Sequence, residues 1–412
     1  MLNKVEIMSP AGSFESLMSA IKAGADSIYF GVEQLNMRSR SANFSLKDLN
    51  KIIKICKSNN IKSYLTLNTI IYDHDITLMK KICNKAKKAD VSAVIVSDVA
   101  VMQYARSINI EVHSSTQLNI SNIDAVKFYS KFSDVIVLAR ELTLKQIKFI
   151  CDEIKKQNIK GPNGKLLKIE IFCHGALCVA ISGKCYMSLA TYNASANRGA
   201  CLQNCRRSYK VIDEETNDEL VINNKYIMSP KDLCTIQFLD KIIDSGVSVL
   251  KIEGRGKPPD YVYTVTKCYK EAVESINNNS YSKDKINFWL KELETVYNRG
   301  FWHGGYYLGK KLGEWSGVYG SKATKKKQGI GKVINYYAKN NVAEIFLESG
   351  ILSKNNELLI TGPTTGISKI KLDKIIINNN EVDFARKDDK ICIKVNEKVR
   401  RNDKVYLVID KK

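Results

Sequence analysis

Short apolar segments alternate with amphipathic helical patterns over the first 275 residues of the chain. The helical patterns place apolar residues three and four positions apart, which is the spacing of one helix face. Eight such units predict an α/β fold, a TIM-like (β/α)8 barrel, although a doubly wound open sheet has the same alternation. The expected strands are Val5–Met8, Ser27–Phe30, Ser63–Leu67, Ala93–Val96, Glu111–Ser114, Val135–Leu138, Lys168–Phe172 and Val249–Ile252.

Three other regions accompany the expected barrel of residues 1–275. A Cys-rich insertion at about residues 173–247 separates the seventh and eighth strands, and a helix is expected to open at Ser229-Pro230-Lys231-Asp232. Residues 276–325 show a helical pattern and are expected to form a helical extension and linker. Residues 326–412 alternate with period two between Gly, Asn and Asp turns, which predicts a small C-terminal all-β barrel domain.

The chain is strongly basic. It carries 64 Lys and Arg residues against 43 Asp and Glu residues, a formal net charge of +21. Such an excess favours an anionic partner such as nucleic acid, because Lys and Arg neutralise backbone phosphates, although a compositional bias of the genome has the same effect. Residues 321–412 contain 20 basic and 11 acidic residues, so the C-terminal domain is expected either to contact RNA or to serve as a soluble lid.

The N-terminus shows no apolar core of a signal peptide. The most apolar run, residues 91–102, is interrupted by Ser92, Ser97 and Asp98 and is shorter than the roughly 20 residues that span a membrane. We therefore expect a cytoplasmic protein with no membrane partner. The sequence leaves open whether it needs a protein partner or forms a homo-oligomer.

Eleven cysteines, an odd number in a chain without an export signal, argue against a disulfide framework. Four of them have the spacing C-x6-C-x15-C-x3-C, namely Cys178, Cys185, Cys201 and Cys205. Thiolates bind zinc or iron–sulfur clusters. Zinc sites usually contain two close pairs of cysteines, and only the last two cysteines here are close. The spacing therefore favours a cluster, while zinc and unligated thiols remain open alternatives.

Three arginines lie close in sequence to the last two of these cysteines: Arg198, Arg206 and Arg207. A four-thiolate iron–sulfur centre carries negative charge, and burying such a charge without a cationic neighbour is costly. We therefore expect these guanidinium groups to compensate the charge of the centre.

The start of the insertion contains a long motif. Residues 170–188 match the pattern E-x-F-x-x-G-A-L-C-x4-G-x-C-x-M-S at each defining position. This motif resembles the signature of the peptidase U32 family, and residues 9–12, 197–199, 251–255 and 298–301 agree with that family in the same order. The resemblance extends over nearly the whole chain, and the overall plan is most similar to the tRNA 5-hydroxyuridine synthase branch.

Resemblance to this branch implies an enzyme that hydroxylates the wobble uridine of tRNA without molecular oxygen, with prephenate as a small anionic co-substrate. It also implies a [4Fe–4S] cluster held by Cys178, Cys185, Cys201 and Cys205. Relatives modify ribosomal RNA, so an rRNA hydroxylase is an alternative. A non-catalytic RNA-binding protein with structural zinc is another.

The family name also raises proteolysis by a collagenase-like peptidase. The chain contains neither an H-E-x-x-H zinc motif nor a G-x-S-x-G nucleophile elbow. A cysteine–histidine pair could still form in space, but the adjacent Cys173 and His174 would point to opposite faces of a strand. The motifs therefore favour RNA modification over proteolysis.

Polar residues stand at the carboxyl ends of the expected strands, the face that carries the active site in TIM barrels. We expect Arg140 and Arg255 to bind the two carboxylates of prephenate, because guanidinium groups bind carboxylates in a bidentate manner, with Lys251 beside them as a further substrate-binding group. Glu253 and His174 are expected to act as catalytic acid or base. The alternative for the arginines and for Glu253 is an ion pair at the barrel rim, and for His174 a buried structural role.

Overall fold

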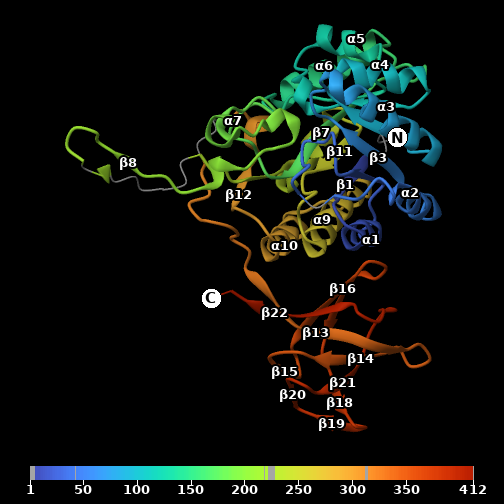
Figure 1. Ribbon diagram of the computed structural model, residues 1–412, viewed down its shortest axis with the longest axis vertical. Helices are drawn as coiled ribbons and strands as arrows, with labels where there is room; N and C mark the ends of the chain where they lie inside the picture. The colour runs from blue at the N-terminus through green and yellow to red at the C-terminus, as the bar shows by residue number, and fades with distance from the viewer. Residues whose placement is uncertain (1–4, 42, 218, 221–227, 311–313, 412) are drawn as a thin grey trace.

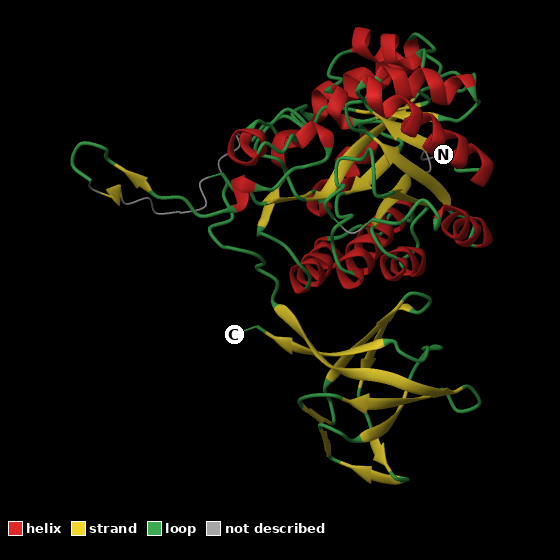
Figure 2. Ribbon diagram, viewed as in Figure 1, coloured by secondary structure: helices red, strands yellow, loops and turns green. Residues whose placement is uncertain are grey.

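The computed structural model describes residues 5–41, 43–217, 219–220, 228–310 and 314–411 (Figure 1). The chain forms a barrel with surrounding helices, a loop-rich insertion at one end of that barrel, and an antiparallel β domain (Figure 2). In Figure 1 the β domain lies beside the helices α1 (Phe14–Lys22), α9 (Pro259–Asn277) and α10 (Lys283–Thr295). No helix in the described part of the chain is both long enough and apolar enough to cross a membrane.

Eight parallel strands form a closed ring. Their order is β11-β1-β2-β3-β4-β5-β6-β7, and pairing of β11 with β7 completes the ring. This closure confirms the predicted TIM-like barrel and excludes the open sheet. The strands are β1 Glu6–Ala11, β2 Ser27–Gly31, β3 Lys62–Leu67, β4 Ala93–Val96, β5 Val112–Ser114, β6 Val135–Val137, β7 Lys168–Gly175 and β11 Val249–Ile252.

A helix follows each barrel strand and covers the outside of the ring. The apolar face of each helix packs against the outward-facing residues of the strands, because these two sets of side chains form one continuous core. Local sequence sets some of the helix ends. For example, Thr143 and Gln146 form a capping box at the start of α6. The helices are α1 Phe14–Lys22, α2 Leu49–Ser58, α3 Ile76–Ala89, α4 Val99–Ser107, α5 Ile123–Ser130, α6 Leu144–Lys156, α8 Leu239–Asp244 and α9 Pro259–Asn277.

The interior of the ring holds a second apolar cluster and one buried ion pair. The cluster consists of Met8, Tyr29, Tyr64, Ala93, Ile95, Val135 and Val249. Lys251 Nζ lies 2.7 Å from Glu170 Oε1, and both side chains are buried. The interior is therefore filled, and space for a ligand is left at the carboxyl ends of the strands.

The insertion between β7 and β11 is mostly irregular. Its first helix is α7, and Figure 1 shows a hairpin of two short strands, β8 and β9, that projects from the barrel. Short 3-10 helices occur here and elsewhere in the chain. These elements are α7 Met187–Tyr192, β8 Val211–Ile212, β9 Glu219–Leu220, η1 Asp73–Asp75, η2 Thr116–Leu118, η3 Ala196–Arg198, η4 Asn204–Arg206, η5 Ile236–Phe238 and η6 Gly305–Leu308.

The prediction of a helix opening at Ser229 is wrong. Asp232 begins strand β10 (Asp232–Cys234), which pairs with the end of β7 and with β12 (Phe301–His303). The reason is tertiary, because the Asp232 amide donates to the carbonyl of Gly300 and holds the segment extended. The capping pattern of the sequence carries no information about that distant partner.

The predicted helical extension of residues 276–325 is helical only in part. α10 covers Lys283–Thr295, and the remainder forms β12, η6 and a linker. Trp302 is buried, and the Tyr307 hydroxyl donates to the Phe172 carbonyl at 2.7 Å. This aromatic turn therefore packs against the end of β7.

The C-terminal domain is an antiparallel β structure with its own apolar core. Its main sheet has the order β17-β16-β22-β13-β14-β21-β18-β19, and β15 pairs with β20. The domain contacts the barrel closely, since a Cβ on Gly366 would lie 2.8 Å from the Met18 Cβ. The strands are β13 Lys325–Tyr337, β14 Val342–Leu347, β15 Ile351–Ser353, β16 Glu357–Gly362, β17 Gly366–Lys371, β18 Ile375–Ile377, β19 Asn380–Val382, β20 Phe384–Arg386, β21 Lys390–Lys394 and β22 Lys404–Asp410.

Candidate active site

A cavity of about 170 Å³ lies at the carboxyl ends of the barrel strands. Its walls come from the strand ends, from the loop after β2 and from the insertion. The structure brings together in this cavity all the expected site residues except His174. Those that line it are Arg140, Cys178, Cys185, Cys201, Cys205, Lys251, Glu253 and Arg255.

The cavity is strongly cationic. One carboxylate, that of Glu253, lies on its wall among the described residues, against five cationic side chains. An enclosed site of this kind attracts anionic groups, because charges interact more strongly where water is partly excluded. The cationic residues are Arg38, Arg140, Arg206, Lys251 and Arg255.

Glu253 is held as a carboxylate. The Arg38 Nη2 donates to Glu253 Oε1 at 2.8 Å, and the Tyr29 hydroxyl lies 3.3 Å from Oε2. Burial by itself would raise the pKa of Glu253, but the charges of Arg38, Arg140 and Arg255 outweigh it and lower that pKa to about 2. An acid with this pKa holds no proton at neutral pH and is a weak base. The arrangement favours the ion-pair alternative for Glu253.

Arg255 is a buried cation with neutral partners. Its Nη1 donates to Asn36 Oδ1 at 3.1 Å and to Thr66 Oγ1 at 2.8 Å. No acidic group in the described chain lies within ion-pair distance of it. Burial lowers the pKa of Arg255 to about 10, so the group is still protonated at neutral pH. Gly31 makes room for it, since a Cβ there would lie 2.2 Å from Nη1. Its remaining donors suit an incoming carboxylate.

Arg140 lies over an aromatic ring. Its guanidinium carbon is 3.8 Å from the centre of the Phe172 ring, and Nη1 donates to the Ala176 carbonyl at 3.0 Å. Its Nε is buried and has no hydrogen-bond partner within the described residues. A buried unpaired donor is costly, so a ligand that accepts a hydrogen bond here would be favoured.

The four thiols are near enough to influence one another. Burial raises the pKa of the Cys205 thiol, the adjacent Arg206 opposes the rise, and the other three cysteines add to it. Nowhere in the described ranges are three or more His, Cys, Asp or Glu side chains arranged to hold a metal ion. The thiols therefore surround the cavity without forming a compact single-ion site. Thiolates are soft donors that bind zinc or iron–sulfur clusters, and these four line one cavity beside Arg206.

Comparison with known proteins identifies the family. Residues 12–317 match the model of peptidase family U32. The chain belongs to this family. It is 56% identical to a protein named collagenase from Porphyromonas gingivalis over 98% of both chains. It is 29% identical to tRNA hydroxylation protein P1 of Bacillus subtilis, over 93% of this chain and 90% of that protein. It is 34% identical to a 23S rRNA 5-hydroxycytidine synthase of Escherichia coli, over 72% of this chain and 44% of that protein.

In this U32 protein a β-bulge turns His174 away from the cavity. Phe172 lies opposite Lys251 in the pairing of β7 with β11, but the register then shifts so that His174 lies opposite Ile252. His174 therefore shares the outer face of the barrel with Ile252. Its ring lies 5.5 Å from the Tyr269 ring, and burial lowers its pKa to about 3. A neutral buried imidazole outside the cavity favours the structural role over the expected catalytic one.

Lys251 lines the cavity, but its positive charge is already paired with a carboxylate. Its ammonium group pairs with Glu170, and it lies over the Tyr29 ring at 4.6 Å. Glu170 Oε2 has no hydrogen-bond partner among the described groups. The pairing leaves Lys251 less available to a substrate than Arg140 or Arg255.

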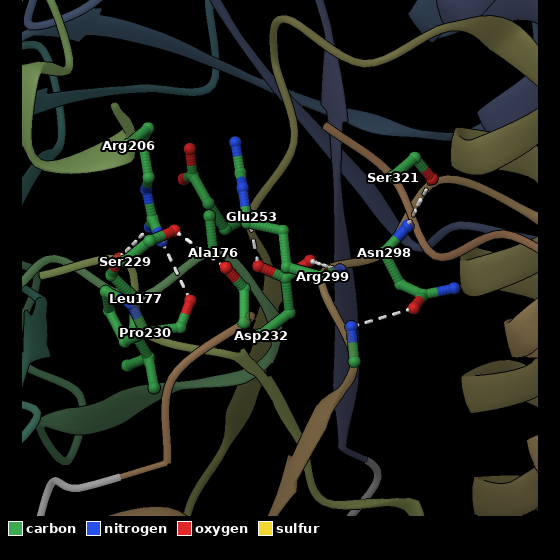
Figure 3. A network of polar contacts seen from close by, with 12 residues as sticks. Ala176, Leu177, Arg206, Ser229, Pro230, Asp232, Glu253, Asn298, Arg299 and Ser321 are labelled. Carbon is green, nitrogen blue, oxygen red and sulfur yellow. Dashed lines mark hydrogen bonds and ion pairs between the residues drawn. The ribbon is translucent and has the colours of Figure 1, made fainter. Parts of the chain in front are cut away.

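Arg206 forms hydrogen bonds that hold together the two ends of the segment from Cys178 to Cys205 (Figure 3). Its Nη1 donates to Ser229 Oγ at 3.1 Å and to the Pro230 carbonyl at 2.8 Å, and its Nη2 donates to the Leu177 carbonyl. Leu177 precedes Cys178, and Arg206 follows Cys205. One guanidinium group therefore links residues next to the first and last cysteines of the motif to the segment just before β10.

The other two flanking arginines have different partners. Arg198 forms an ion pair with Asp75 and stacks on the Tyr72 ring at 4.1 Å. Arg207 is exposed and donates to the Tyr192 hydroxyl at 2.6 Å. Of the three arginines expected to compensate a cluster, only Arg206 lines the cavity with the cysteines.

Arg38 is a site residue that the sequence patterns did not assign to the cavity. It stands in the loop after β2, and its partner Glu253 is 215 residues away in the chain. The one signal available was the position of its loop at the carboxyl end of a barrel strand. Gly199 shows how closely this loop meets the insertion, because a Cβ on Gly199 would lie 2.3 Å from the Asn36 carbonyl oxygen.

Proposed function

We propose that this U32 protein is an RNA hydroxylase that converts the wobble uridine of tRNA to 5-hydroxyuridine, with a [4Fe–4S] cluster and prephenate as co-substrate. One observation carries the proposal: a single cavity at the mouth of the barrel combines four cysteine thiols with arginines that have no acidic partner in the described chain. Two relatives named for tRNA and rRNA hydroxylation support the choice of RNA as substrate.

Cys178, Cys185, Cys201 and Cys205 are the residues that would hold the cluster. When bound, such a cluster supplies a redox or Lewis-acid centre beside the substrate. Arg206 then serves as a cation next to the thiolates, and its hydrogen bonds keep the cysteine segment closed over the barrel. The thiolate charge that is costly to bury is thereby partly compensated.

The arginines would bind the co-substrate. Prephenate has two carboxylates, and Arg140 and Arg255 line the same cavity without an acidic partner in the described chain; the Nε of Arg140 also has no hydrogen-bond partner there. Arg38 and Glu253 hold each other in place beside them. In this arrangement the two arginines orient the co-substrate, and Glu253 keeps the third guanidinium group from competing for its carboxylates.

The proposed reaction is a balanced exchange. Replacing the hydrogen at uridine C5 by a hydroxyl group adds one oxygen atom and removes two electrons from that carbon. The exchange balances if the carbinol carbon of prephenate gives up its hydroxyl, takes the hydrogen and is reduced by two electrons. The base must leave its stack to reach the cavity, which an unpaired anticodon loop makes easy.

The name of the Porphyromonas gingivalis relative raises proteolysis as the second candidate. None of the described residues that line the cavity is a histidine, so no imidazole there can activate a cysteine. Cys173 and His174 do not form a pair either, since the Cys173 thiol contacts the Lys251 carbonyl and His174 contacts Tyr269. The arrangement supports hydroxylation over peptide cleavage.

Nucleoside mass spectrometry tests the proposal. A strain that lacks this gene and any redundant paralogue is expected to lose 5-hydroxyuridine derivatives from tRNA, and the wild-type gene to restore them. A Cys185→Ser variant is expected to restore none of these nucleosides and to contain little iron after anaerobic purification, whereas the matched Cys392→Ser variant on β21 should behave as wild type.

Two outcomes would contradict the proposal. If the deletion strain keeps the modified tRNA nucleosides but loses 5-hydroxycytidine from rRNA, the substrate is rRNA. Cleavage of a generic protein substrate that survives Cys185→Ser would favour the peptidase.

A further inference from the structure

A second cavity lies between the barrel and the β domain. Its volume is about 510 Å³, three times that of the cavity with the cysteines, and it is formed by the start of α9, the end of α10, the linker and the strands β13, β16, β17 and β22. Its apolar surface includes Val296, Leu358 and Ile370. We call it the interdomain cleft.

Most of the charged residues that line the interdomain cleft are lysines. Six lysines line it against three acidic residues among the described part of the chain. Lys327 pairs with Asp260 at 2.5 Å, and Lys325 pairs with Glu357 at 2.6 Å. The other four lysines have no ion-pair partner there. They are Lys326, Lys369, Lys371 and Lys411.

The unpaired lysines come from separate elements that the fold brings together. Lys326 is on β13, Lys371 ends β17, and Lys411 follows β22. All three are exposed. Lys411 is held in place, since its Nζ donates to the Ser321 carbonyl at 2.8 Å. Like charges repel one another, so a bound anion would relieve the repulsion among these lysines.

The interdomain cleft adjoins the face of the barrel that carries the cysteines. Pro258 lines the cleft and follows the cavity residue Arg255 by only three positions. Lys257, between them, has its Nζ 3.1 Å from the centre of the Tyr297 ring, and Tyr297 is part of the cleft wall. Arg299 lies 5.3 Å from the same ring, and its charge is matched by Asp232 at 3.5 Å.

The geometry points to the interdomain cleft as the seat of an RNA phosphate backbone, with Lys326, Lys371 and Lys411 as its phosphate contacts. This inference rests on the proposed function, because it is the RNA substrate that must be held while one base enters the cavity. An RNA arm in the cleft runs beside the mouth of the barrel and leaves an adjoining loop within reach of the cysteines. Point charges on flexible stems suit a phosphate chain, which needs no fixed hydrogen-bond geometry.

Salt-dependent binding of a tRNA transcript tests the inference. The cleft variant Lys326→Gln/Lys371→Gln/Lys411→Gln is compared with a matched variant, Lys339→Gln/Lys387→Gln/Lys394→Gln, whose three exposed lysines lie on the same domain but not in the cleft. Each lost phosphate contact reduces the slope of log affinity against log salt by about 0.7 to 0.9. We expect the cleft variant to lose about 2 to 3 from this slope and to bind roughly tenfold to a hundredfold more weakly, and the matched variant to lose neither.

Equal losses in both variants would show that net charge alone matters and would overturn the inference. So would an unchanged slope in the cleft variant, or a cleft variant that loses binding to an acidic polypeptide but keeps tRNA. The same variants are also introduced into the deletion strain to test whether they restore 5-hydroxyuridine. The melting temperature of each purified variant shows whether it is folded. If the wild-type gene fails to restore 5-hydroxyuridine, the proposed function fails; if it succeeds and the folded cleft variant succeeds equally, only this inference fails.

Discussion

Arg38 donates to Glu253 across 2.8 Å and so joins the loop after the second barrel strand to the end of the eighth. The contact closes one side of the cavity. Because Glu253 neutralises one of several neighbouring guanidinium groups, it decides how many of them are left for an anionic ligand. It also connects two segments on either side of β1 that are 215 residues apart in the chain.

Replacing Glu253 by Gln is expected to destabilise the protein by up to roughly 3 kcal/mol at pH 7, because the folded state lowers its pKa from 4.5 to about 2. A lowered carboxyl pKa stabilises the fold above pH 4.5, and this contribution is lost as the pH falls to about 2. Urea unfolding at several pH values measures the difference. The exposed Glu274→Gln is the control. A gap between wild type and E253Q that stays constant down to pH 2 would contradict the assignment.

Replacing Arg206 tests its role as a link between the cysteines. We expect Arg206→Gln to lose most of its iron and Arg206→Lys to retain part of it, because lysine keeps the charge but cannot reach Leu177, Ser229 and Pro230 together. Iron content and the rate of iron loss to a chelator, both without air, are the measurements. The exposed Arg207→Gln should match wild type. If R206Q retains all of its iron, Arg206 is not needed to hold the cysteine segment for iron binding.

The buried pair of Lys251 and Glu170 should be strongly coupled. Either single change, Lys251→Met or Glu170→Gln, leaves a buried charge without its partner and is expected to cost about 3 to 5 kcal/mol. The double variant should recover much of that loss, since both charges are then gone. Urea unfolding of the four proteins forms a double-mutant cycle. Additive losses would mean that the two groups do not interact in solution.

His174 is expected to affect acid stability and not catalysis. Its pKa is lowered to about 3 in the folded protein, so unfolding takes up a proton below pH 6.5. Stability should therefore fall by about 1.4 kcal/mol per pH unit from pH 6.5 towards pH 3 through this group. A folded His174→Phe variant should lack this slope and keep nucleoside hydroxylation. Loss of activity in a stable, iron-loaded H174F protein would restore the catalytic role.

Tertiary contacts explain where the sequence-based predictions stopped short. The capping pattern at Ser229 predicted a helix, but the amide of Asp232 finds the Gly300 carbonyl and the segment becomes a strand. The strand pattern placed His174 at the end of β7, yet a single extra residue turns its side chain outward. Arg38 could not be assigned to the site because its partner is distant in the sequence.

The sequence by itself determined the order of strands and helices and the cysteine motif, whereas the pairing of β11 with β7 decided that the sheet closes into a barrel. In each of the eight strand–helix units, the spacing of the apolar residues along the chain specifies which side chains are buried. The spacing of Cys178, Cys185, Cys201 and Cys205 is likewise local information. Only the tertiary structure decided which charges are paired. Ring closure sets Arg38 against Glu253 and leaves Arg140 and Arg255 without acidic partners in the described chain, and such distances depend on how the whole chain packs.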